Sequence, residues 1–228
     1  MSKLPQLGWT IREHVDRIAR SSPARLAIAV FASVIALFTA LLLMPWATAS
    51  GQRAPFIDAF FTATSAVCVT GLTVVDTGVF WSQAGLVTIM LAIKVGGLGV
   101  MTLASILGMA VSRRIGLTQR MLTAPEVKAD KLGEVGSLVG VVIVTSTILE
   151  LLIATVLAGR FLSLGESIGN AAWLGLFYAV SSFNNAGFVP TPEGLQPYIA
   201  DWFICIPIAL GVFIGALGFP VILNVGRR

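Results

Sequence analysis

Charged residues are scarce in this sequence, and their scarcity excludes most soluble folds. Only 11% of the 228 residues are Asp, Glu, Lys or Arg, whereas 56% are hydrophobic and the mean hydropathy is +0.90. Soluble domains contain about 25% charged residues, so this composition is typical of an integral membrane protein. The net charge of +4 does not indicate nucleic acid binding, because the basic residues lie in segments between apolar runs.

Cysteine and histidine are also rare. Cys68 and Cys205 lie far apart inside apolar stretches, so we expect two buried thiols and no disulfide. The single histidine, His14, lies in a charged N-terminal segment, where no Ser/His/Asp set or metal cluster can form around it within the membrane. We therefore expect no enzymatic activity and no cofactor in this chain.

Long apolar runs dominate the rest of the chain. Four of them reach the roughly 20 residues that one bilayer crossing requires; they cover residues 24–44, 81–111, 138–157 and 202–225. Two further apolar segments, 60–72 and 176–188, lie between these runs and are too short to cross. Such a segment is typical of a half-helix that enters the membrane and turns back as non-helical backbone, buried in protein or facing water.

The two short segments repeat each other in register, which predicts a duplicated unit. The predicted fold class is all-α integral membrane, with two tandem helix–pore-loop–helix units that contain four spanning helices and two re-entrant half-helices. The predicted divisions are an N-terminal lead (1–22), a first unit (23–112), a connector (113–136) and a second unit (137–228). The residues that match between the segments are Phe61 with Phe177, Ala63 with Ala179, Ser65 with Ser181 and Gly71 with Gly187.

The distribution of basic residues predicts the orientation. Twelve of the fifteen Lys and Arg residues lie in the first 25 residues, in the connector or at the C-terminus. By the positive-inside rule these parts are cytoplasmic, and both short segments enter the membrane from outside. We therefore expect a multi-pass protein of the cell membrane with both termini in the cytoplasm. The outer loops carry more acidic than basic residues, which would concentrate cations there.

The end of each short segment has the composition of a cation-binding loop. A half-helix directs the negative end of its dipole into the membrane, and glycine allows the following carbonyl groups to replace the hydration shell of a potassium-sized ion. The alternative is a helix break in a receptor or scaffold, where the glycines serve packing; the repetition in register favours the pore. The candidate ion-binding residues are Val69, Thr70, Gly71 and Leu72 in the first loop and Asn185, Ala186, Gly187 and Phe188 in the second.

Lys94 and the nearby glycines are further candidates for a pore or gating role. A charge inside a membrane span is a functional hypothesis by default. Lys94 could pair with an acid such as Glu150, or it could face a water-filled cavity and repel cations. Glu150 itself is expected to make a helix–helix contact. The glycines expected to allow close helix packing around the pore are Gly96, Gly97 and Gly99 after Lys94, and Gly215 and Gly218 in the last run.

Three motifs resemble the Trk/Ktr/HKT superfamily of potassium transporters, and most closely the membrane subunit of bacterial Ktr systems. The resemblance implies that Gly71 and Gly187 are filter glycines and that potassium, with sodium as a second candidate, is the substrate. In plant relatives a serine at the first position accompanies sodium permeation, so Gly71 implies a preference for potassium. The resemblance also implies a cytoplasmic nucleotide-binding regulatory partner. The motifs cover residues 64–72, 96–102 and 182–188.

The sequence departs from that superfamily in having two units where the family has four. It resembles the N-terminal half, so either a C-terminal half is missing or two copies pair as a homo-oligomer in the lipid bilayer. The alternative function is a truncated or assembly-type membrane subunit with no continuous pore of its own. A small-solute carrier would need polar side chains at the membrane midplane, and few are present.

Overall fold

The structure, a computed structural model, describes residues 23–120 and 131–217. Within these ranges the chain is helical and forms no strand, apart from an isolated bridge between Thr48 and Trp81. The all-helical prediction is therefore confirmed for the described residues. In chain order the elements are α2 (Pro23–Leu42), η1 (Pro45–Ala47), α3 (Phe56–Val67), α4 (Thr77–Phe80), α5 (Gln83–Arg120), α6 (Lys131–Ser163), α7 (Ile168–Phe183), η2 (Gln196–Tyr198) and α8 (Trp202–Leu217).

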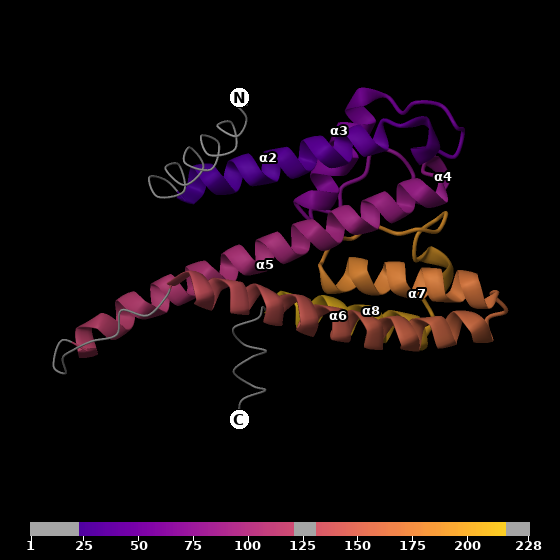
Figure 1. Cartoon of the computed structure of the whole chain (residues 1–228). Coiled ribbons are helices and arrows are strands. Elements are labelled where there is room, and N and C mark those ends of the chain that lie inside the picture. The colour runs from indigo at the N-terminus through magenta and orange to yellow at the C-terminus, as the bar shows by residue number, and fades with distance from the viewer. Residues whose placement is uncertain (1–22, 121–130, 218–228) are drawn as a thin grey trace, which may run out of the picture.

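The helices form two groups, with α2, α3 and α5 in the first and α6, α7 and α8 in the second. In the first group α3 packs against α2 and α5, and in the second α7 packs against α6 and α8. Helix α5 also contacts α6 and α7, and it runs between the two groups in Figure 1. The contacts of α5 therefore join the first unit to the second.

Local sequence explains where the short helices begin. Helix α3 follows Pro55 and carries Asp58 in its first turn, where a carboxylate complements the helix dipole. Helix α7 is capped by Ser167, whose hydroxyl accepts a hydrogen bond from the Asn170 amide at 3.3 Å. With 12 and 16 residues, these helices are about 18 and 24 Å long.

Two stretches are long and apolar enough to cross a membrane by length and composition: Gln83–Thr102 of α5 and Gly140–Ser163 of α6. The other two predicted crossings correspond to shorter apolar stretches, Ala27–Leu42 and Trp202–Leu217. Helix α6 leaves a row of apolar side chains exposed, which suits contact with lipid. That row contains Val141, Val144, Ile148, Leu151, Leu152 and Val156.

Helices extend into both ends of the predicted connector (113–136): α5 continues to Arg120, and α6 already begins at Lys131. Residues 115–120 contain no proline and include Leu, Gln and Arg, which favour helix, so the polar composition that suggested a loop does not interrupt α5. The predicted N-terminal lead (1–22) lies outside the described residues, as do 121–130 and 218–228.

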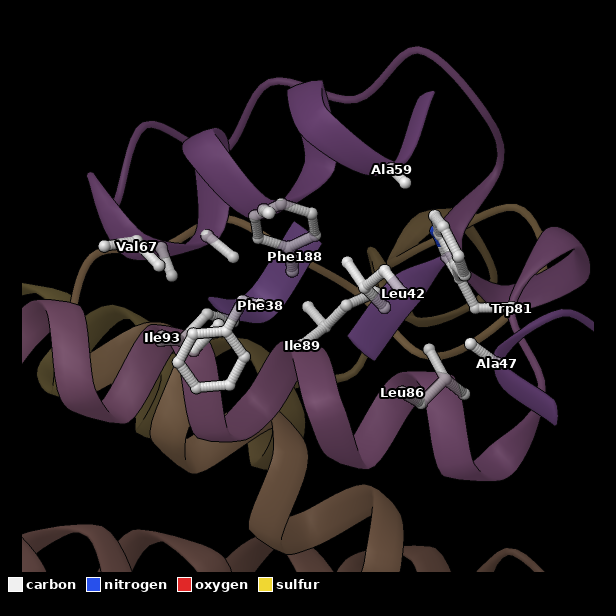
Figure 2. Packing of buried hydrophobic residues seen from close by; sticks show 14 of the residues in the cluster. Phe38, Leu42, Ala47, Ala59, Val67, Trp81, Leu86, Ile89, Ile93 and Phe188 are labelled. Carbon is white, nitrogen blue, oxygen red and sulfur yellow. The ribbon is translucent and has the colours of Figure 1, made fainter. Parts of the chain in front are cut away.

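The core of the first unit includes a side chain from the second. Figure 2 shows Phe188 lying between α3 and α5, among residues such as Phe38 of α2 and Ile89 of α5. Phe188 is 1% exposed. Because its ring packs among buried side chains of α2, α3 and α5, Phe188 anchors the loop after α7 to the first unit.

Candidate ion-binding loops

The loops after α3 and α7 share an unusual backbone conformation. Val69 and Gly71 have φ angles of 57° and 72°, and the corresponding residues Asn185 and Gly187 have φ angles of 59° and 73°. Left-handed backbone costs a residue with a side chain about 1 to 2 kcal/mol, and it is least expected for a β-branched residue such as Val69. The same strained conformation occurs at equivalent positions of both loops. It therefore indicates that something other than reversal of the chain direction requires this backbone geometry.

The hydrogen bonds that close the two helix ends are also equivalent. In each loop three consecutive amides donate back to three carbonyl groups of the helix that precedes it. After α3 the bonds are Cys68 N to Thr64 O (2.8 Å), Val69 N to Ala66 O (3.3 Å) and Thr70 N to Ser65 O (2.9 Å). After α7 they are Asn184 N to Val180 O (3.1 Å), Asn185 N to Ser182 O (3.0 Å) and Ala186 N to Ser181 O (2.7 Å).

The carbonyl oxygens beyond these helix ends remain available for a ligand. Within the described ranges, no hydrogen bond is donated to the carbonyl oxygens of Val69, Thr70, Gly71, Asn185, Ala186 or Gly187. Phe188 differs, because its carbonyl accepts a hydrogen bond from the Ser181 hydroxyl at 2.7 Å. Free peptide oxygens in short succession are suitable ligands for a monovalent cation.

The structure brings the two loops together at their glycines. A Cβ atom built on Gly71 would lie 2.6 Å from the carbonyl oxygen of Ala186, and one built on Gly187 would lie 3.4 Å from the Gly71 Cα. Position 71 therefore has no space for a side chain unless the second loop moves. The other predicted loop residues lie in the same two segments, with Thr70 and Leu72 exposed and Val69 partly buried.

Glycines of the inner helices allow those helices to approach the ends of α3 and α7. A Cβ on Gly96 would overlap the carbonyl oxygen of Val67, and a Cβ on Gly215 would overlap that of Phe183. The two carbonyls occupy equivalent places at the ends of α3 and α7. Gly99 instead faces the ring of Phe31, and Gly218 lies outside the described residues.

Lys94 pairs with Glu150, which was one of the two alternatives for this residue. Its Nζ lies 2.6 Å from Glu150 Oε2 and 3.0 Å from Ser146 Oγ. Glu150 joins α6 to α5, so the expected helix–helix contact is confirmed. The sequence interpretation missed Ser146 and Asn184, and Asn184 donates to Glu150 Oε1 at 2.9 Å. Asn184 lies within the second motif, at the position that corresponds to Cys68 in the first.

An open cavity of about 560 Å³ lies between the two units. Both units contribute to its lining, including Trp81 and Ser82 from the first and Glu166, Trp173 and Tyr198 from the second. Burial raises the pKa of the Tyr198 hydroxyl above its ordinary value, and the negative charge of Glu166 raises it further. Among the residues that the structure describes, no group of three or more His, Cys, Asp or Glu side chains could hold a metal ion.

Two similar loops at the ends of short apolar helices, with free carbonyl groups and glycines at their contact, are features of a protein class that handles cations in membranes. Comparison with known families agrees: residues 5–227 match the TrkH family, described as cation transport protein, and the chain belongs to this family. The resemblance inferred from the motifs is therefore confirmed.

Several curated relatives are similar over most of this chain. The Ktr system potassium uptake protein B of Bacillus subtilis is 39% identical over 219 residues, which are 95% of this chain and 48% of that protein. The Ktr system potassium uptake protein D of the same organism is 33% identical over 90% of this chain and 45% of its own length. The potassium/sodium uptake protein NtpJ of Enterococcus hirae is 33% identical over 89% and 45%.

The chain spans about half the length of the curated relatives it matches. The names of these relatives describe uptake proteins and not enzymes, in agreement with the expectation that the chain is not an enzyme.

Proposed function

We propose that this chain forms part of a pore that carries potassium ions across the cell membrane, with the two loops providing half of its selectivity filter. The observation that carries the proposal is the pair of equivalent backbones at 69–71 and 185–187, which lie against each other at Gly71. A desolvated ion would bind these oxygens in place of water. The names of the Ktr and NtpJ relatives support potassium, with sodium as a second substrate.

The proposed topology has four membrane crossings and two re-entrant helices, α3 and α7. The re-entrant assignment is supported by the length of α3, about 18 Å against a bilayer core of about 30 Å, and by the equivalent chain reversals after α3 and α7. Both termini and the connector would be cytoplasmic, and the loops would face outward. Gly96, Gly97, Gly99, Gly215 and Gly218 would pack the inner helices around the pore. The resemblance implies a nucleotide-binding regulatory subunit on the cytoplasmic face.

The test is potassium uptake in a bacterium that lacks its own potassium transporters. The chain would be produced alone and as a chimera with the C-terminal half of the Bacillus subtilis Ktr system potassium uptake protein B. We expect the chimera to restore growth at low potassium and the chain alone to fail. Growth with the chain alone would indicate pairing of two copies. A correctly inserted chimera that takes up no potassium would contradict the proposal.

The alternative is a truncated or assembly-type subunit with no continuous pore of its own. Such a subunit would leave uptake unchanged when Gly71 is replaced in the chimera. A filter residue would change the selectivity of uptake, so the same chimera separates the two functions.

A further inference from the structure

A buried polar network crosses from the first unit to the end of α7. It begins at Lys94 on α5, whose Nζ donates to Ser146 Oγ at 3.0 Å and to Glu150 Oε2 at 2.6 Å, both on α6. The second oxygen of Glu150, Oε1, accepts a hydrogen bond from Asn184 Nδ2 at 2.9 Å. One carboxylate thus connects a cation of the first unit to the residue that directly precedes the second candidate loop.

Asn184 is held on several sides. Its Nδ2 also donates to the Val180 carbonyl at 2.8 Å, and its Oδ1 is buried with no hydrogen-bond partner among the described residues. That oxygen lies against Gly97 of α5, where an added Cβ would overlap it. The amide is therefore fixed between α5 and α6, next to Asn185 with its left-handed backbone.

The ion pair gives the network its strength. The side chain of Glu150 is 4% exposed and that of Lys94 is 21% exposed, in otherwise apolar helices. A carboxylate buried at this depth is stable only when it is paired and hydrogen-bonded. Without Lys94 we expect Glu150 to turn away or to lose its contacts, and Asn184 would then lose the acceptor that positions it.

The first loop lacks an equivalent support, which shows that the shared backbone does not require one. Cys68 occupies the position of Asn184 and is exposed, and Cys205 is only partly buried, so the expectation of two buried thiols was wrong. The hydrogen bonds that close the helix end are nevertheless the same in both loops. The network is therefore an addition specific to the second loop and not a requirement for forming it.

We propose that Lys94, Glu150 and Asn184 are positioning residues that couple the inner helix of the first unit to the second loop and set the cation preference at residues 185–187. None of the three need touch the ion, because they act through the backbone of Asn185. The proposal rests on the proposed function for its effect on ions, and on the structure alone for its effect on the loop.

The first experiment does not depend on transport. Hydrogen exchange would be measured on the purified chain in lipid nanodiscs, comparing peptides over 184–188 with peptides over 68–72. We expect Lys94→Met to accelerate exchange about tenfold in the second loop and much less in the first. Arg160→Met is the matched control, because it removes an ion pair with Asp201 (2.8 Å) that joins α6 to the start of α8. Equal acceleration in both loops, or none, would overturn the proposal.

Two double variants separate positioning from simple charge balance. Lys94→Met with Glu150→Gln removes both charges but keeps an oxygen that accepts from Asn184, whereas Lys94→Met with Glu150→Leu removes the acceptor as well. We expect the Gln variant to restore slow exchange in the second loop and the Leu variant to leave it fast. If both double variants recover equally, only the unpaired charge mattered and the proposal is wrong.

The last measurement is the potassium-to-sodium uptake ratio of the same variants in the chimera. We expect Lys94→Arg and the Gln double variant to keep the ratio, and Lys94→Met and the Leu double variant to lower it about tenfold. A parent chimera without uptake would refute the proposed function and leave the exchange result to decide the coupling. An unchanged ratio in a transporting Lys94→Met chimera would refute the coupling and leave the function intact.

Discussion

The two loops have the same backbone but different supports. Each follows an apolar helix, closes it with three equivalent hydrogen bonds and places left-handed residues at the same two positions. In the first loop the polar side chains remain local, with Thr70 donating to Ser65 at 3.0 Å. In the second, Asn184 reaches Glu150 on α6 and Phe188 enters the core of the first unit. The loop conformation is thus a local property of the repeated motif, whereas its attachment is specific to each unit.

The largest effect is expected where an inner helix touches the end of α7. Gly215→Ala places a methyl group against the carbonyl oxygen of Phe183, a backbone atom that cannot rotate away. We expect destabilisation of about 3 kcal/mol, measured as a lower melting temperature of the detergent-solubilised protein. Gly159→Ala on α6 is the control, because nothing lies within 4 Å of the added methyl group, and it should be neutral or slightly stabilising. Equal melting temperatures would show that the contact at Gly215 is not tight.

The second comparison concerns the glycines of the two loops. Gly71→Ser should raise sodium uptake relative to potassium about tenfold in the chimera, equivalent to about 1.4 kcal/mol, because the side chain displaces the oxygen of Ala186. Gly187→Ser should have a smaller effect, since its nearest neighbour is 3.4 Å from the added Cβ. A larger change at Gly187, or none at Gly71, would contradict the arrangement of the two loops.

A smaller difference is expected between the equivalent serines. Ser181→Ala removes the buried donor to the Phe188 carbonyl, so the free energy of unfolding should fall by about 1 kcal/mol or slightly more. Ser65→Ala removes only an acceptor for Thr70, which is exposed and can bind water instead. Chemical denaturation in mild detergent would measure both variants. If the Ser65 variant is the less stable of the two, the second loop does not depend more than the first on the hydrogen bond of its serine, and the prediction is wrong.

The smallest effect is expected from exchanging the left-handed residues. Val69→Asn should stabilise the chain by about 0.5 kcal/mol and Asn185→Val should destabilise it by about 1 kcal/mol, because Asn tolerates positive φ and Val does not. Melting temperatures of the single variants and the double exchange would test this. Effects of the same sign at both positions would indicate that the backbone angles do not determine the outcome.

The repeated elements could be predicted from the sequence because their signals are local. Gly71 and Gly187 occur at matching places in matching segments, and the structure places both in loops directly after short helices. The pairing of Lys94 with Glu150 was one of two open alternatives, since a charge in an apolar run requires a partner or water. Composition alone could not decide between them.

Contacts between the units could not be predicted in the same way. Nothing in the segment around Phe188 indicates that its ring packs between α3 and α5 rather than within its own unit. Positive φ at Val69 was missed because valine is among the residues least expected to adopt it. The continuation of α5 to Arg120 was not apparent from composition, although residues 115–120 contain no proline to end the helix.

The close approach at Gly71 limits how this protein could diverge. The neighbour of Gly71 is a peptide oxygen, which is present whatever amino acid occupies position 186. No compensating substitution there can make room, so a lineage that gains a side chain at position 71 must tolerate a displaced partner loop. Evolutionary change at this position would then alter both repeats in one step rather than through gradual, paired replacements.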